Sequence, residues 1–310
     1  METEKQSGSI DGGAAWQEML SDLYEEERMG REDFAQNREM LAAKLESLPK
    51  AAQDEMWRAQ NAAFMTAFER SGLPQAEELL GRLFPEGPDG QDGEYDYMRR
   101  LLEKNDDGYV VGEMLEREVF DFYKKAALKL QEDFRADMAE ELKSRRYVKA
   151  VETLVEKGLL PEVFLKNVNK LDPAAAEFLP PKYYLYDSSY KTSAGGHARS
   201  GGEVRFNIGL YRPNHASNVV DAVMDHEHTH YIAGRRITFG DEEKNRRMNE
   251  AMTESIAYLI TVASGREPEV SLDDVKFGDG HSYRAEREEM KEIMKTDAAR
   301  DFYLTAYALE

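Results

Sequence analysis

Two histidines and a glutamate in one short segment have the types and spacing needed for metal chemistry. His226 and His230 are four residues apart, and Glu227 directly follows the first histidine. Residues four apart lie on one face of an α-helix, so both imidazoles can bind one tetrahedral zinc ion. Glu227 is rotated by about 100° around the helix and can reach a zinc-bound water without binding the metal. Because zinc lowers the pKa of its water to about 7, Glu227 is expected to activate that water for attack on a carbonyl.

A second segment offers a third metal ligand. Glu250 follows His230 by 20 residues, within an Asn-Glu-Ala-x-x-Glu sequence that ends at Glu254. Together with the His-Glu-x-x-His sequence at His226, this segment resembles the gluzincin metallopeptidases, the thermolysin-like clan. The resemblance implies that His226, His230 and Glu250 bind one Zn²⁺ ion. It also implies that Glu254, where the clan has Asp, hydrogen-bonds a ligand imidazole and fixes its orientation.

The resemblance covers about residues 182–265 and also implies a substrate strand. In the clan, the strand before the metal helix binds extended peptide by adding it to a sheet edge. The counterpart here is the alternating segment from Val204 to Leu210. An interior strand without a substrate role is equally open, because alternation does not show where a strand lies in its sheet. The expected substrate-binding residues are Val204, Phe206, Asn207 and Ile208.

The clan also uses a Tyr or His to stabilise the oxyanion that forms at the scissile carbonyl. His281 and Tyr283 lie in a Gly-rich segment after the third ligand and are the candidates for this role. A solvated loop position is the alternative for His281. His228 lies off the face of His226 and His230, so a surface or supporting role is expected for it.

The elements that must position these residues follow from periodicity and capping signals. The metal helix is expected to begin at 214–217 and to end at Gly234, and the second helix to run from Asp241 to Ser264. Strands are expected over Tyr183–Tyr186 and Val204–Leu210. The stretch from 188 to 202 is rich in Gly and Ser and is expected to be a flexible loop. Two further helices are expected near the C-terminus, over Tyr283–Lys295 and Ala298–Leu309.

The rest of the chain predicts an α+β, mostly helical fold. Residues 1–13 are rich in Gly and charge and read as a disordered lead-in. Residues 14–172 show helical periodicity, with a long apolar stripe from Met114 to Leu142 that favours a helical bundle over a coiled-coil dimer. Residues 173–310 are expected to form a zincin-like catalytic domain with a small sheet and metal-binding helices.

Composition narrows the range of partners and locations. The 310 residues are 41% hydrophobic, carry a formal net charge of -20 and include no cysteine. An acidic surface repels phosphate groups, so neither nucleic acid nor a membrane surface is an expected partner. The polar start of the chain does not resemble a secretory signal, and the densest apolar run, 257–263, is too short to cross a bilayer. A cytoplasmic protein is expected, with signal-free export as an effector left open.

The function that these observations favour is hydrolysis of peptide bonds by a zinc-dependent endopeptidase acting on a peptide or protein. Within that class, a regulatory protease with a single target or a bacterial effector delivered into host cells remains open. The alternative from another class is a helical scaffold or binding protein with a structural or degenerate zinc site. Retention of Glu227 counts against it, because a structural site does not need a general base.

Overall fold

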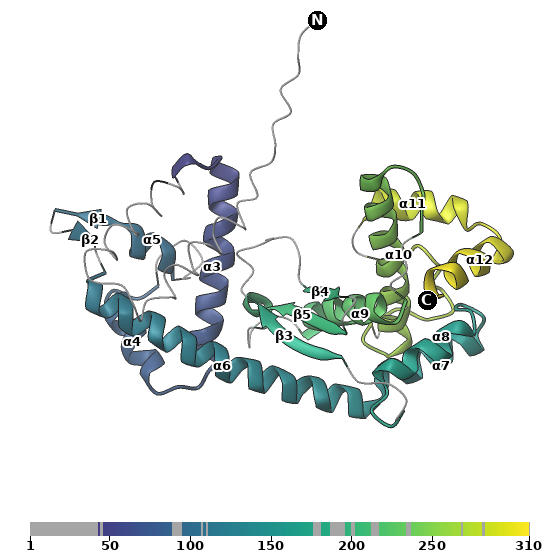
Figure 1. The fold of residues 1–310 in the computed structure, drawn as a ribbon, viewed down its shortest axis with the longest axis horizontal. Coiled ribbons are helices and arrows are strands. Elements are labelled where there is room, and N and C mark those ends of the chain that lie inside the picture. The colour runs from purple at the N-terminus through teal and green to yellow at the C-terminus, as the bar shows by residue number, and fades with distance from the viewer. Residues whose placement is uncertain are drawn as a thin grey trace, which may run out of the picture. The chain divides into compact units, whose positions relative to one another are not determined.

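Helices dominate the described part of the chain, together with two small sheets (Figure 1). The α+β, mostly helical fold class is therefore confirmed. The lead-in expected over residues 1–13 and the helical pattern of residues 14–42 lie outside the described residues. The computed structural model describes residues 43, 46–88, 95–106, 108–109, 111–175, 181–186, 196–199, 202–211, 217–233, 237–267, 269–280 and 283–309.

The chain divides into two compact units. Unit 1 comprises Met1–Leu130, Tyr186–Ala194 and Asn207–Pro213, and unit 2 comprises Gln131–Leu185, Gly195–Phe206 and Asn214–Glu310. Residues 131–172, which the sequence assigns to the helical half, belong to unit 2. Gln131 and Arg135 bind the backbone oxygen of Tyr183, and these contacts tie that stretch to the sheet. All three expected metal ligands lie in unit 2.

Unit 1 is a set of helices around an aromatic core. The ring of Phe64 lies 4.2 Å from that of Tyr97 and 4.3 Å from that of Tyr123, and Phe68 stacks on Phe122. Such ring contacts add to the hydrophobic stabilisation of a core. The elements of unit 1 are α3 (Lys50–Arg70), α4 (Gln75–Leu83), α5 (Tyr97–Leu102), the paired strands β1 (Lys104–Asn105) and β2 (Gly108–Tyr109), the first part of α6 (Glu113–Ser144), and the 3-10 helix η4 (Ile208–Leu210).

Unit 2 packs helices around a three-stranded sheet. Its helix α10 packs against α9, and α9 in turn packs against strand β4 (Figure 1). Its elements are the rest of α6, α7 (Arg146–Glu156), α8 (Val163–Val168), the 3-10 helix η2 (Asn169–Leu171), β3 (Lys182–Tyr186), β4 (Gly196–Arg199), β5 (Glu203–Asn207), α9 (Ser217–Ala233), α10 (Glu242–Ala263), α11 (Arg284–Ile293) and α12 (Asp297–Ala308).

The helices that carry the site residues form where the sequence predicts them. The Asp241 side chain caps α10 by accepting a hydrogen bond from Lys244 N–H. Two acidic residues in the first turn stabilise the helix by interacting with the positive end of its dipole. Gly265 follows the end of α10 with a φ of 76°, a conformation that glycine adopts without strain. The structure contains both helices predicted around the site, α9 and α10, and the predicted long helix α6. These predictions are confirmed.

The sheet corrects the substrate-strand prediction. The strand order is β3-β5-β4, so β5 is the middle strand and its backbone is already paired on both sides. It therefore cannot add a peptide strand, and Ile208 lies beyond it in η4. The segment expected to be a flexible loop instead contains β4, which pairs antiparallel with β5. The residues predicted to bind substrate are core residues, buried to 7% exposure or less: Val204, Phe206, Asn207 and Ile208.

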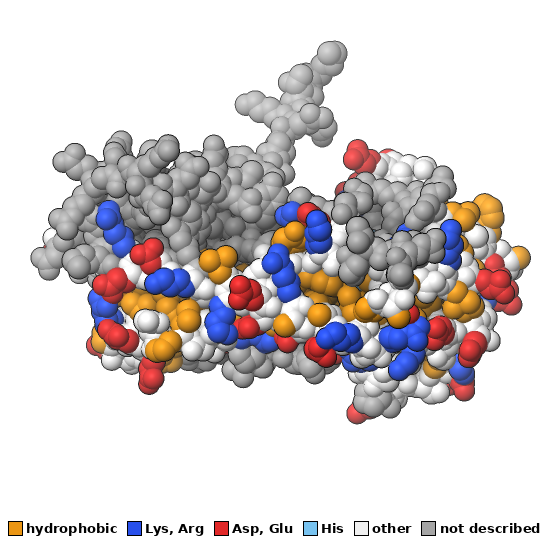
Figure 2. Space-filling view, turned by 60° about the horizontal axis from the view of Figure 1, so that its bottom comes forward, with side chains coloured by type: hydrophobic (Ala, Val, Ile, Leu, Met, Phe, Trp, Pro, Cys, Tyr) orange, Lys and Arg blue, Asp and Glu red, His pale blue; other side chains and the backbone are white. Residues whose placement is uncertain are grey.

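The surface carries charges of both signs. Figure 2 shows a face on which Lys and Arg side chains are interspersed with Asp and Glu, with small hydrophobic patches between them. No helix among the described residues is long and apolar enough to cross a membrane.

Candidate metal centre

The three expected ligands converge on one point between α9 and α10. His226 and His230 present their Nε2 atoms from α9, and Glu250 presents a carboxylate oxygen from α10. Each Nε2 lies 3.2 Å from the same Glu250 Oε2. One ligand atom from each residue lies within 4.8 Å of the others, and each side chain is partly exposed. The predicted ligand set is therefore brought together as a possible metal-binding group.

The distances between these ligand atoms fit the binding of one ion by all three residues. A tetrahedral zinc ion with bonds of about 2.0–2.1 Å holds its ligand atoms about 3.3–3.4 Å apart. The two 3.2 Å separations between nitrogen and oxygen are close to that edge length. Two imidazoles with one carboxylate are a donor set that zinc accepts in catalytic sites, where a fourth position stays open.

The other ring nitrogen of each histidine has its own partner. Nδ1 of His226 lies 3.3 Å from Glu254 Oε2, and Nδ1 of His230 lies 3.3 Å from Thr253 Oγ1. Both partners are on α10, within about one turn of Glu250. Because Nδ1 is engaged in each ring, Nε2 is the atom left to face an ion. Glu254 thus has the position that the resemblance implies for it.

The electrostatics of the group favour a positive charge at its centre. Burial on its own lowers the pKa of His226, but hydrogen bonds to Glu250 and Glu254 outweigh burial and raise that pKa to about 10. Burial also acts to raise the pKa of Glu250, yet the hydrogen bonds from His226 and His230 bring it well below its usual range. Carboxylates that favour a charged imidazole also favour a divalent cation at the same point.

Glu227 lies beside this group without joining it. Its side chain is only 3% exposed, and its Oε2 is buried without a hydrogen-bond partner among the described residues. Burial raises the pKa of the Glu227 carboxyl, and the nearby His226 and His230 offset part of that rise. A buried carboxylate oxygen without a partner is rare and points to an unfilled polar contact.

Strand β4 holds Glu227 in this position. The backbone of Ala198 hydrogen-bonds the Glu227 carboxylate. Gly196 lies so close that a Cβ added there would come within 2.8 Å of Glu227 Cγ and within 2.8 Å of the Arg205 carbonyl oxygen. Only glycine fits at that position without displacing Glu227 or the paired strand.

Tyr283 lies within electrostatic range of the site. It precedes α11 with a φ of 53°, a left-handed conformation that is rare for a residue with a side chain. Burial raises the pKa of its phenol, and the carboxylate of Glu250 raises it further. The phenol therefore keeps its proton at neutral pH and can donate a hydrogen bond. His281, the other oxyanion candidate, lies outside the described residues.

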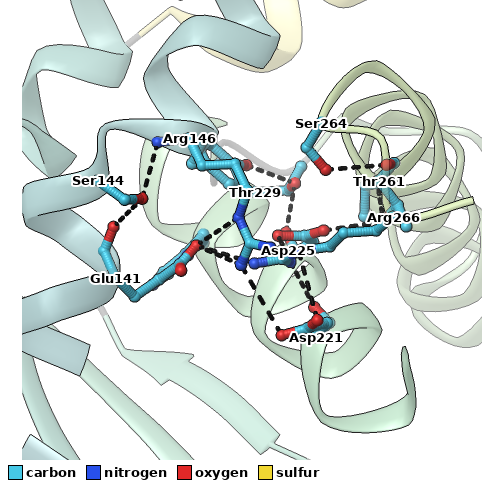
Figure 3. Close-up of polar contacts among 12 residues, drawn as sticks. Glu141, Ser144, Arg146, Asp221, Asp225, Thr229, Thr261, Ser264 and Arg266 are labelled. Atoms are coloured by element: carbon cyan, nitrogen blue, oxygen red, sulfur yellow. Dashed lines mark hydrogen bonds and ion pairs between the residues drawn. The ribbon is translucent and has the colours of Figure 1, made fainter. Parts of the chain in front are cut away.

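Around Asp225, α9 is fixed by a cluster of charged residues (Figure 3). Asp225 accepts hydrogen bonds from Arg266, at 2.7 Å, and from Thr261, at 2.8 Å. Arg266 also binds Glu141 at 2.8 Å, and Glu141 binds Arg146 at the same distance. These contacts connect α9 to α10, α6 and α7, so they help to fix the spacing of the two helices that carry the candidate metal ligands.

His228 and Thr229 also face away from the metal group. His228 is 2% exposed, and its Nε2 lies 2.8 Å from the Tyr183 hydroxyl. Burial lowers its pKa to about 4, so the ring is neutral at physiological pH. Thr229 pairs with the Tyr147 hydroxyl at 2.8 Å. His228 is thus a buried residue that anchors the helix, and the surface position considered for it is wrong.

Sequence reasoning missed several of the supporting residues. Thr253 could have been found, because it lies three residues after Glu250 and so on the same helix face. Its partner Tyr307 is 54 residues away, and Arg266 lies 41 residues from Asp225. Such separations give no periodic signal, and only the folded chain reveals them.

Comparison with known proteins leaves the site to be judged on its geometry. No family model, no curated protein and no solved structure matches this chain.

Proposed function

We propose that this protein is a zinc-dependent endopeptidase of the gluzincin type. One observation carries the proposal. Two Nε2 atoms and a carboxylate oxygen are spaced as ligands of a single ion, and a buried carboxylate oxygen of Glu227 without a partner lies beside them. The resemblance of the two sequence segments to that clan agrees with this arrangement.

His226, His230 and Glu250 would hold the ion. When bound, zinc polarises a carbonyl group and lowers the pKa of water. Glu227 accepts a proton from the attacking water and later gives it to the leaving amine. Its raised pKa suits a group that must both take and return a proton near neutral pH.

Tyr283 is the proposed donor to the oxyanion. Its phenol is protonated and lies within electrostatic range of Glu250. A neutral donor aimed at a developing negative charge stabilises the transition state more than the ground state. His281 keeps the same role as a hypothesis.

The substrate is proposed to pair with β4, in place of the middle strand β5. Among the described strands, β4 has a hydrogen-bonded neighbour on one side only. It also contacts the general base through Gly196 and Ala198. An extended peptide added at this edge would pass directly over Glu227. Backbone pairing of this kind suits an unfolded or extended protein segment.

The rival from another class is a protein with a structural zinc site. Structural sites are closed, with four protein ligands. Among the described residues, this group has three, and a carboxylate oxygen without a partner lies beside it. Both features favour the catalytic alternative.

The test is metal analysis combined with a Glu227→Gln variant. Wild type and variant are loaded with zinc and incubated with a library of unfolded proteins, and new peptide termini are counted by mass spectrometry. We expect equal zinc content in the two proteins and cleavage that is about 10²–10⁴-fold slower in the variant than in the wild type. If both proteins bind zinc and neither cleaves above background, the peptidase proposal fails.

A further inference from the structure

The two candidate ligand histidines have chemically different hydrogen-bond partners at Nδ1. Nδ1 of His226 faces a carboxylate, whereas Nδ1 of His230 faces the hydroxyl of Thr253. That hydroxyl lies 2.5 Å from the hydroxyl of Tyr307, which comes from the C-terminal helix α12. Thr253 is 0% exposed and Tyr307 is 1% exposed. The two hydroxyls, called here the hydroxyl pair, are therefore shielded from solvent.

The number of protons available around Thr253 determines which atom donates in each of its hydrogen bonds. A threonine hydroxyl has one proton and two acceptor lone pairs. Thr253 donates its proton to the backbone carbonyl of Asn249, at 3.0 Å. Its two lone pairs can then accept one hydrogen bond from the Tyr307 O–H and one from His230. The carbonyl, two hydroxyls and imidazole form a consistent chain in which every proton has an acceptor.

The hydrogen bond from His230 to Thr253 fixes the tautomer of the imidazole ring. If Nδ1–H donates to Thr253, the proton is on Nδ1 and the lone pair is on Nε2. Nε2 is the atom that lies 3.2 Å from Glu250 Oε2, where an ion would be shared. An outer partner that sets both ring orientation and tautomer is known to strengthen metal binding by histidine.

Helix α12 is held by a hydrogen bond next to Tyr307. Asn167 on α8 donates a hydrogen bond of 2.6 Å to the carbonyl oxygen of Ala308, next to Tyr307. Tyr307 is thus held by its own helix as well as by Thr253. A fixed phenol can orient the threonine hydroxyl, because Tyr307 donates to one of its lone pairs and leaves the other to His230.

We propose that Tyr307 is a positioning residue of the metal centre, acting through the Thr253 hydroxyl on His230. This inference rests on the proposed metallopeptidase function and deepens it. It assigns to the last helix of the chain a part in metal affinity that the sequence motifs do not contain.

The test measures zinc affinity, by competition with a chelator, in variants of the hydroxyl pair. Thr253→Val removes the hydroxyl at nearly constant shape and is expected to weaken zinc binding about tenfold, the low end for outer partners. Thr253→Ser keeps the hydroxyl and is expected to bind as the wild type does. Tyr307→Phe is expected to weaken binding by a smaller factor, of about threefold to tenfold.

A double variant separates positioning from folding. Replacing both members of a hydrogen-bonded pair with apolar groups of the same shape costs little stability. Thr253→Val/Tyr307→Phe is therefore expected to melt like the wild type without metal and to bind zinc no more weakly than Thr253→Val alone. Tyr303→Phe, one turn earlier on α12, is the matched control and is expected to leave zinc affinity unchanged.

The outcomes distinguish the two proposals. A wild type that binds no zinc overturns the proposed function, and this inference with it. A wild type that binds zinc and cleaves peptides, with variants of the hydroxyl pair that bind equally well, overturns only the inference. So does a Thr253→Ser variant as weak as Thr253→Val, or a double variant whose loss is the product of the two single losses.

Discussion

His226 and His230 point from α9 toward Glu250 on α10, and the neighbouring Glu227 has a carboxylate oxygen without a partner among the described residues. These three residues of α9 are called here its front face. In the charged cluster around Asp225, called here the back face of α9, both oxygens of Asp225 are bonded, one to Arg266 and one to Thr261. Both faces are lined with polar side chains and lie largely away from solvent. They differ in the carboxylates: both oxygens of Asp225 are hydrogen-bonded, whereas Oε2 of Glu227 is not, although Arg266 Nε has only an ion pair with Asp221, at 3.4 Å.

This difference distinguishes a group of side chains that can bind a ligand from a group that holds neighbouring helices in place. Buried polar atoms are normally satisfied, so an atom left without a partner needs an explanation, and a bound water or ion is one of them. A satisfied charge network instead fixes the arrangement of the elements it connects. The charge network of the back face connects α9 to α10 and so supports the spacing of the candidate ligand atoms on the front face.

The largest effect is expected from loss of a ligand on the front face. Glu250→Ala removes one of three ligands, so zinc affinity should fall by more than the roughly 10–100-fold typical of an outer partner. Zinc competition with a chelator measures this change. Glu242→Ala, in the exposed first turn of the same helix, should bind like the wild type. Unchanged affinity in Glu250→Ala would remove the basis of the site.

A change on the back face should act on folding. Arg266→Met leaves Asp225 buried without its cation, and breaking a buried pair costs about 3–5 kcal/mol of unfolding free energy. Urea unfolding of the metal-free protein measures it. The control is Lys143→Met, whose exposed pair with Glu140 should contribute about 0–1 kcal/mol. Equal losses in the two variants would show that the charged cluster does not hold α9.

Tyr283→Phe should leave the metal in place and slow the reaction. Loss of one donor to an oxyanion lowers kcat by about 10²–10³-fold, and zinc affinity should not change. Steady-state kinetics on a cleaved peptide test this expectation, with Tyr258→Phe on α10 as control. A kcat within twofold of the wild type would return the oxyanion role to His281.

The smallest of these effects is expected at Gly196. In Gly196→Ala, the added methyl group meets Glu227 Cγ and the Arg205 carbonyl, so the base must shift. A loss in kcat on the order of tenfold is expected, below the roughly hundredfold that a 1 Å misplacement can cost. In Gly81→Ala the added Cβ meets nothing within 4 Å, so that variant should be neutral. Full activity in Gly196→Ala would show that β4 does not position Glu227.

The sequence predicts the front face of α9 better than the back. His226, Glu227 and His230 follow from helix geometry alone, because residues four apart share a face whatever the fold. Strand β4 was missed because its Gly- and Ser-rich surroundings resemble a loop, and its pairing with β5 is a tertiary contact. The partners Arg266 and Tyr307 are invisible for the same reason, since nothing local links them to α9.

The most direct test of the central claim is an anomalous difference map at the zinc edge, from crystals of the Glu227→Gln protein loaded with zinc. We expect one strong peak bonded to Nε2 of His226, Nε2 of His230 and a carboxylate oxygen of Glu250, with residue 227 beside it and not bonded to it. A map without a peak between α9 and α10, from protein that contains zinc, would contradict that claim.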